Sequence, residues 1–243
     1  MRIMGFELTR TPSQSAFLRS RSVDLVLDVG ANRGQYAKGL RKEGYRGRIQ
    51  SFEPVSTVFA KLQTASARDA NWHARHCAVG ENAGIAEINV SKNTVYSSIR
   101  QQTTMSAEFS YKSAVVATEK VAVISLDAIM SEPQNIGYQN IFLKIDTQGY
   151  EKDVLLGAVN VLKRCVGIQL ELPVEHLYQD VWSFNDALLH MEALGFVPAQ
   201  FRMVNPLHDD PASGIEFDCI FRQKRQSRVC PGLIESKEDS LLL

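Results

Sequence analysis

Apolar runs of strand length alternate with stretches of helical spacing in the first 80 residues of this chain. The run Val23–Val29 is followed by Tyr36 and Leu40, which fall on one face of a predicted helix. A second predicted helix begins at Pro54, and His73–Val79 predicts a further strand. Strands that alternate with helices form parallel sheets, so this pattern predicts an α/β fold.

The alternation stops between residues 81 and 126. Ile85–Val90 and Val121–Leu126 predict two strands, but the connection between them is long and polar, with aromatic residues among serines. Connections of this length in compact domains are often lids or binding loops. We therefore expect residues 91–120 to form an insertion on the acceptor side of a binding site. The alternative is a disordered excursion that never contacts the substrate.

The α/β pattern resumes in the second half of the chain. Ile141–Ile145 predicts a strand, an apolar face from Tyr150 to Leu162 predicts a helix, and Val166–Leu170 predicts the next strand. Phe196–Met203 and Ile215–Phe221 then predict an antiparallel pair. The sequence thus predicts a mostly parallel, twisted sheet that closes with an antiparallel C-terminal strand pair.

Length and composition favour a single catalytic domain. A chain of 243 residues that is 44% hydrophobic can bury one sizeable core. We place an N-terminal extension at residues 1–22, the domain at 23–222 and a flexible tail at 223–243. Within the domain, Ser183–Asp186 has the sequence of a capping box and predicts a helix start. A net charge of zero makes nucleic acid an unexpected partner.

The cysteines and the absence of long apolar runs indicate the compartment. None of the four cysteines, at positions 77, 165, 219 and 230, forms a C-x-x-C pair or has zinc-site spacing. No apolar run reaches membrane-spanning length. We expect a cytoplasmic protein without an integral membrane segment, with peripheral contact at the inner face of the membrane if its acceptor is a lipid. The oligomeric state stays open.

A glycine turn follows the first strand, in the segment Asp28–Gly34, and an acid, Glu53, ends the second strand. Such a turn lets a ligand approach the backbone, and such an acid can accept hydrogen bonds from both hydroxyls of a ribose. Asn32 replaces the second glycine that a dinucleotide's diphosphate needs. S-adenosylmethionine carries no phosphate, so the pattern indicates the first motif of a Rossmann-like class I methyltransferase.

Five segments in the same order resemble the FkbM family of S-adenosylmethionine-dependent O-methyltransferases, and the likeness covers residues 20 to 222. Gln148 departs from the commonest form of the family, which has an acid there. Within the family, the chain looks most like the sugar (fucosyl or rhamnosyl) O-methyltransferases of mycobacterial cell-envelope glycolipids. The segments are Asp28–Gly34, Phe52–Pro54, Ala78–Gly80, Phe142–Glu151 and Gln169–Leu172.

Ligands of open α/β sheets bind outside the carboxyl ends of the strands, so the motif residues at those ends should converge on one crevice. Glu53 is the expected ribose acceptor, although it could instead cap the helix that starts at Pro54. The other expected cofactor contacts position the methionine end or border the adenine. The predicted cofactor-binding residues are Asp28, Gly30, Asn32, Gly34, Glu53, Val79 and Gly80.

Methylation of a sugar hydroxyl benefits from a general base, and Asp146 with Glu171 is the predicted catalytic pair. Asp146 could instead orient the cofactor or cap the next helix. A divalent cation such as Mg²⁺ between the two carboxylates has only weak support. Other candidate bases are Glu175, His176, His208, Asp209 and Asp210.

Three functions remain to be compared. The leading prediction is an S-adenosylmethionine-dependent O-methyltransferase with a small-molecule or glycolipid acceptor. An NAD-dependent oxidoreductase could use the same strand, turn and helix, but Asn32 argues against it. A catalytically silent cofactor-binding interaction module is the third possibility.

Overall fold

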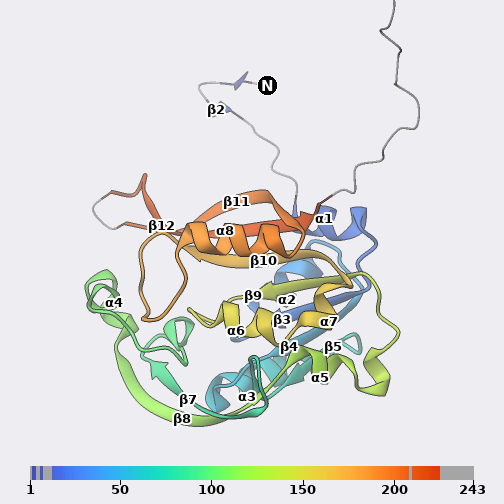
Figure 1. Ribbon diagram of the computed structural model, residues 1–243, viewed down its shortest axis with the longest axis horizontal. Helices are drawn as coiled ribbons and strands as arrows, with labels where there is room; N and C mark the ends of the chain where they lie inside the picture. The colour runs from blue at the N-terminus through green and yellow to red at the C-terminus, as the bar shows by residue number, and fades with distance from the viewer. Residues whose placement is uncertain (1, 4–5, 8–12, 208–209, 225–243) are drawn as a thin grey trace, which may run out of the picture.

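The computed structural model describes residues 2–3, 6–7, 13–207 and 210–224. Its centre is a seven-stranded sheet with the order β11-β12-β10-β9-β3-β4-β5 (Figure 1). Five neighbouring strands are parallel: β3 (Leu25–Val29), β4 (Arg48–Phe52), β5 (Trp72–Arg75), β9 (Ile141–Ile145) and β10 (Cys165–Pro173). The last two strands are antiparallel: β11 (Phe196–Pro206) and β12 (Gly214–Gln223). The predicted α/β fold, with its antiparallel C-terminal pair, is confirmed.

Helices cover both faces of the sheet, so its central strands are apolar on both sides. On β3, Leu25 and Leu27 pack into one core cluster and Val26 into the other. The first cluster holds side chains from α5 (Leu126–Met130), α6 (Glu151–Leu156), α7 (Val159–Leu162) and α8 (Phe184–Ala193). The second holds side chains from α1 (Gln14–Ser20), α2 (Gln35–Lys42) and α3 (Ser56–Ser66).

A second, three-stranded sheet packs beside α3. It has the order β6-β8-β7, and Val58 of α3 packs against Ile88 and Val121 from this sheet. Figure 1 shows its long hairpin at the opposite end of the molecule from the β11–β12 hairpin. Its strands are β6 (Ala78–Val79), β7 (Gly84–Ser91) and β8 (Val115–Ile124).

Two predicted elements differ from the structure in this region. The single strand expected at His73–Val79 is divided, because β5 pairs with β4 whereas β6 leaves the main sheet and pairs with β8. The expected polar connection 91–120 is shorter, since β8 begins at Val115. The first half of β8 is mostly exposed, and its sequence does not alternate between apolar and polar residues. The sequence therefore did not predict this part of the strand. Before β8 lie η1 (Thr94–Tyr96), α4 (Thr104–Phe109) and η2 (Tyr111–Ser113).

The helix expected after β9 is also divided. A Cβ atom at Gly157, between α6 and α7, would lie 2.1 Å from the Gly80 carbonyl oxygen, so this close approach requires a glycine that interrupts the helix. The capping box at Ser183 and Asp186 is present as predicted. The remaining elements are η3 (Pro133–Asn135) and the short pair of β1 (Arg2–Ile3) with β2 (Phe6–Glu7).

Three cysteines, Cys77, Cys165 and Cys219, are free and buried, which fits small apolar side chains. Cys230 and the rest of the expected tail from 225 onward lie outside the described residues. Helix α1, in the expected N-terminal extension, places Phe17 and Leu18 in the core. Among the described helices, none combines the length and the apolar composition needed to cross a membrane.

Candidate functional site

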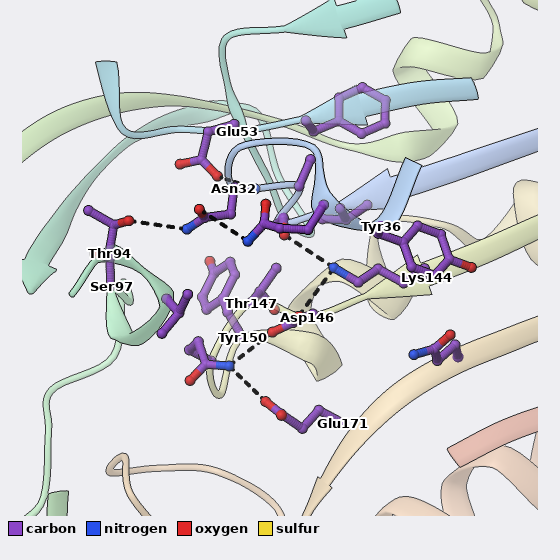
Figure 2. Close-up of a pocket in the computed structure, with 18 of the residues that line it drawn as sticks. Asn32, Tyr36, Glu53, Thr94, Ser97, Lys144, Asp146, Thr147, Tyr150 and Glu171 are labelled. Atoms are coloured by element: carbon purple, nitrogen blue, oxygen red, sulfur yellow. Dashed lines mark hydrogen bonds and ion pairs between the residues drawn. The ribbon is translucent and has the colours of Figure 1, made fainter. Parts of the chain in front are cut away.

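A cavity of about 570 Å³ lies at the carboxyl ends of the parallel strands, where an open α/β sheet binds its ligands. Its walls include the turn after β3, the end of β4, and the ends of β9 and β10. Figure 2 shows Asn32 and Glu53 on one side of this space and Asp146 and Glu171 on the other. The volume is in the range of sites that enclose a small organic ligand.

The turn after β3 has three residues with positive φ: Gly30 at +73°, Asn32 at +48° and Gly34 at +77°. Asparagine tolerates this left-handed region better than most residues, which accounts for its place between two glycines. A Cβ atom at Gly30 would lie 1.8 Å from the carbonyl oxygen of Asp146. Gly30 is therefore required by the approach of β9, in addition to any ligand contact.

Glu53 is held by the backbone of the glycine turn. One carboxylate oxygen accepts from the Asn32 amide and the other from the Val55 amide, each at 2.9 Å. A carboxylate has about four acceptor positions, so two remain for a ligand. Burial raises the Glu53 pKa to about 7, although these two backbone hydrogen bonds and Lys144 lower it.

Lys144 joins the ends of β3 and β9. Its Nζ atom lies 3.4 Å from Asp28 Oδ1 and 3.2 Å from Asp146 Oδ2, and it donates to the Gly30 carbonyl at 3.2 Å. Burial alone would lower the pKa of Lys144. The charges of Asp146 and Asp28, together with the hydrogen bonds to them, have the larger combined effect and raise the pKa above its ordinary value. Lys144 is thus a buried cation that fixes the glycine turn and orients Asp146.

Hydrogen bonds to neighbouring side chains fix the backbone of the loop between β9 and α6. Gln148 has a φ of +58° and Gly149 one of +96°. Glu151 accepts hydrogen bonds from the backbone amides of Thr147 and Gly149, at 2.9 and 3.2 Å. Ser98 donates to the Gln148 carbonyl at 2.6 Å. A non-glycine residue in the left-handed region is strained, so these hydrogen bonds are needed to hold the Gln148 backbone in place.

Gln148 bridges the two predicted catalytic carboxylates. Its amide nitrogen donates to Asp146 Oδ1 at 2.9 Å and to Glu171 Oε2 at 2.7 Å (Figure 2). Tyr178 donates to the Gln148 amide oxygen at 2.9 Å, which fixes the orientation of the amide. Parallel strands β9 and β10 are neighbours, which brings Asp146 and Glu171 together at their carboxyl ends.

The two carboxylates have unequal surroundings. Asp146 is paired with Lys144, and its side chain is 39% exposed. Burial raises the pKa of Glu171 well above its ordinary value, and the negative charges of Asp146 and Glu216 raise it further. Glu171 therefore binds a proton more tightly than an ordinary glutamate side chain does.

The remaining predicted residues fall into two groups. Val79 lines the cavity together with Val55 and Cys77. Asp28 is fully buried behind the Gly30 turn, where it pairs with Lys144 and accepts from Ser51, and a Cβ at Gly34 would meet Trp72 at 2.6 Å; neither residue lines the cavity. Gly80 is not among the cavity-lining residues, and neither are Glu175, His176 and Asp210; His208 and Asp209 lie outside the described residues.

Several cavity residues were not predicted. They come from the N-terminal helix, from α2 and from the antiparallel end of the sheet. Polar residues at every second position of otherwise apolar strands, such as Gln169 and Glu171 on β10, were a signal that could have identified some of them. These residues are Gln14, Tyr36, Gln169, Arg202, Asn205 and Asp218.

Within residues 13–207 and 210–224, no group of three or more His, Cys, Asp or Glu side chains is arranged to hold a metal ion. Asp146 and Glu171, for which a shared cation had only weak support, are bridged by the Gln148 amide.

The chain matches the family model described as the methyltransferase FkbM domain over residues 28–198. No curated protein matches it. A solved FkbM methyltransferase from Methylobacillus flagellatus KT is 17% identical, with a TM-score of 0.49, over 82% of this chain and 43% of that one. This chain therefore spans less than half the length of that protein.

Two further solved structures are similar at lower identity. One is the 1,6-didemethyltoxoflavin-N1-methyltransferase of Burkholderia thailandensis with bound S-adenosylhomocysteine, at 12% identity and a TM-score of 0.46, over 87% of this chain and 76% of that one. The other is Aeropyrum pernix fibrillarin with S-adenosyl-L-methionine, at 10% identity and a TM-score of 0.42, over 82% and 66%.

Proposed function

The chain belongs to the FkbM methyltransferase family, and we propose that it is an S-adenosylmethionine-dependent O-methyltransferase acting on a glycosyl hydroxyl. The observation that carries this proposal is one cavity with a ribose-type acceptor, Glu53, near the glycine turn and a carboxylate pair, Asp146 and Glu171, across from it. The resemblance of the sequence to sugar O-methyltransferases of mycobacterial glycolipids supports a role in cell-envelope glycolipid biosynthesis.

The residues near Glu53 fit the nucleoside part of the cofactor. Val55, Cys77 and Val79 give this end of the cavity an apolar wall suited to an adenine. The two free acceptor positions of Glu53 suit the ribose hydroxyls, and Gly30 and Asn32 expose backbone to the methionine end. When bound, the cofactor supplies an electrophilic methyl group on a sulfonium.

The carboxylate pair suits the hydroxyl that accepts the methyl. Glu171, whose pKa is raised, takes the hydroxyl proton as the oxygen attacks, while Asp146, held by Lys144 at 3.2 Å, orients the hydroxyl. Gln148 holds both carboxylates in place. Because the displacement needs a collinear approach, this fixed geometry contributes mainly through positioning.

The acceptor-side role expected for residues 91–120 stays a proposal, and the part of this segment that lines the cavity lies beside Asn32, on the Glu53 side (Figure 2). Thr94, Tyr96 and Ser97 line the cavity, and Thr94 Oγ1 accepts from the Asn32 side-chain amide at 3.3 Å. A hydroxyl-rich segment with an aromatic ring suits a sugar. We place the enzyme in the cytoplasm, at the inner membrane face when its acceptor is lipid-linked.

Calorimetry with S-adenosylhomocysteine and with NAD tests the cofactor. We expect the first to bind and the second not to bind. Glu53→Gln should lower S-adenosylhomocysteine affinity about tenfold or more, since it replaces a charge-assisted acceptor. Glu87→Gln, on the exposed face of β7, is the matched control. NAD binding in place of S-adenosylhomocysteine, or equal affinity in both variants, would contradict the proposal.

A radiolabelled methyl-transfer assay tests the reaction. The acceptors are methyl glycosides of rhamnose and fucose and a glycolipid extract, compared with phenolic and amine acceptors. We expect labelled methyl ether on the sugar. Transfer to nitrogen or to a phenol alone would show that the reaction is a different methylation.

A further inference from the structure

The cavity continues past the carboxylate pair toward the antiparallel end of the sheet. Its walls there come from five elements, α1, α2, β10, β12 and β11, and one polar residue of each is central to the argument. We call this part the distal arm and define it by these residues: Gln14, Tyr36, Gln169, Asp218 and Arg202.

Strand register explains why polar side chains meet in this arm. Glu171 on β10 lies opposite Asp218 on β12, and Asp218 lies opposite Arg202 on β11, so these three residues form one row across the sheet. Residues paired in this way project to the same face of a sheet. Arg202 and Asp218 form an ion pair within the row.

The distal arm lies beyond the part of the cavity that the cofactor fits. Neighbouring strands are roughly 4.8 Å apart, so β12, four strands from β4, lies about 19 Å from it. The ribose contact, Glu53, is at the end of β4, and the sulfonium of the cofactor is attached directly to the ribose. With the ribose bound at Glu53, the methyl group of the cofactor would lie on the side of the ribose that faces the distal arm.

Free hydrogen-bonding atoms in the distal arm define its chemistry. Gln14 donates to the Gln169 amide oxygen and to the Tyr36 hydroxyl, each at 2.5 Å, which leaves the Gln169 amide nitrogen as a donor. Arg202 donates to Asp218 Oδ2, and among the described residues no hydrogen bond uses Asp218 Oδ1. Asp218 and Gln169 are both largely buried. Unused acceptors and donors in a confined space favour a ligand rich in hydroxyl groups.

We propose that the distal arm is the acceptor subsite and that it binds a polyhydroxylated ring, with Asp218 and Gln169 as the residues that select it. Asp218 Oδ1 accepts from ring hydroxyls, the Gln169 amide donates to a neighbouring oxygen, and Tyr36 lines the wall. One ring hydroxyl then lies beside Glu171. This inference rests on the proposed function, since it assumes that the cofactor occupies the Glu53 side.

Ligand-observed NMR on the protein saturated with S-adenosylhomocysteine tests the subsite. The probes are methyl α-L-rhamnoside, methyl α-L-fucoside and, as a flat aromatic hydroxyl compound, catechol. We expect the glycosides to bind. Asp218→Asn and Gln169→Leu should each weaken glycoside binding roughly tenfold, without changing S-adenosylhomocysteine affinity. Asp69→Asn, which removes an ion pair with Arg41 outside the cavity, is the matched control.

Other outcomes would overturn the subsite. Binding of catechol alone, no glycoside binding, or glycoside affinity that is equal in Asp218→Asn and Asp69→Asn would each do so. An equal fall in S-adenosylhomocysteine affinity in Asp218→Asn would show that the arm holds the methionine end of the cofactor. If glycosides bind and depend on Asp218 but no methyl is transferred, the subsite stands and the proposed reaction fails.

Discussion

The two halves of the cavity are built in different ways. On the Glu53 side, β3, β4 and their turns supply the contacts, and the Glu53 carboxylate bonds to backbone amides 2 and 21 residues away. On the distal side, Gln14 bonds to Gln169, 155 residues away, and the other residues come from α2 and from the strands β11 and β12.

Under the proposed function, this difference separates binding of the cofactor from selection of the acceptor. The Glu53 side fixes its geometry mainly with backbone groups of β3, β4 and their turns, to which β9 adds the Asp146 carbonyl packed against Gly30 and the Lys144 side chain. The distal side depends on side chains whose positions require the complete sheet. Substitutions there can change acceptor choice while the cofactor contacts stay intact.

The largest expected effect concerns the residues between the two halves. Glu171→Gln and Asp146→Asn should each lower the turnover number by about 100-fold to 10,000-fold, because they remove the proton acceptor or the group that orients the hydroxyl. Affinity for S-adenosylhomocysteine should stay at the parental value. Turnover and calorimetry on the same preparations check this, and near-parental turnover in both variants would exclude the pair as catalytic.

Gly30→Ala should disturb both sides of the cavity, because Gly30 packs directly against Asp146. The added Cβ would lie 1.8 Å from the Asp146 carbonyl oxygen at a φ of +73°. Left-handed strain and overpacking together should lower the free energy of unfolding by roughly 2–5 kcal/mol and weaken cofactor binding. Gly137→Ala, which meets nothing within 4 Å, is the control for denaturant unfolding. Equal stability of the two variants would show that β9 can move away from the turn.

The stability of the Glu53 side should depend on pH. Burial raises the Glu53 pKa to about 7, from an ordinary value of 4.5. The folded protein therefore holds this proton more tightly than the unfolded chain, and rising pH from about 4.5 to 7 lowers stability.

Glu53→Gln removes this titration. Its free energy of unfolding, relative to the parent, should increase with pH across that interval by up to about 3 kcal/mol. Denaturant unfolding at several pH values, with Glu87→Gln alongside, measures the difference. A constant difference between Glu53→Gln and the parent would show that the Glu53 carboxyl titrates alike in the folded and unfolded states.

The smallest expected effect lies behind the distal side, on the opposite face of the sheet. Ser183 caps α8, whose Ala187 and Met191 pack into the core there. Ser183→Ala should cost about 1 kcal/mol of stability and leave cofactor and glycoside affinities unchanged. A loss of glycoside affinity in this variant would show that the distal arm depends on the packing of α8.

Much of the Glu53 side could be predicted from the sequence. The apolar run of β3, the glycine turn and the acid at the end of β4 are close in the chain, so their spacing in the sequence predicts how they lie relative to one another. The capping box at Ser183 was predictable for the same reason, because its hydrogen bonds span three residues. Apolar runs also predicted which strands are buried, although not where the His73–Val79 segment divides.

Only the tertiary structure decided what lies across the cavity. Gln148 was a departure from a family pattern, and its role as a bridge between Asp146 and Glu171 depends on the pairing of β9 with β10. The distal arm depends on strand order, which brings Gln14 to Gln169 and Asp218 to Glu171. The sequence by itself determined the local turns and the burial of the strands, because short-range sterics and hydrophobic periodicity act within a few residues. Long-range side-chain contacts follow from the register and order of the assembled sheet, which no local pattern encodes.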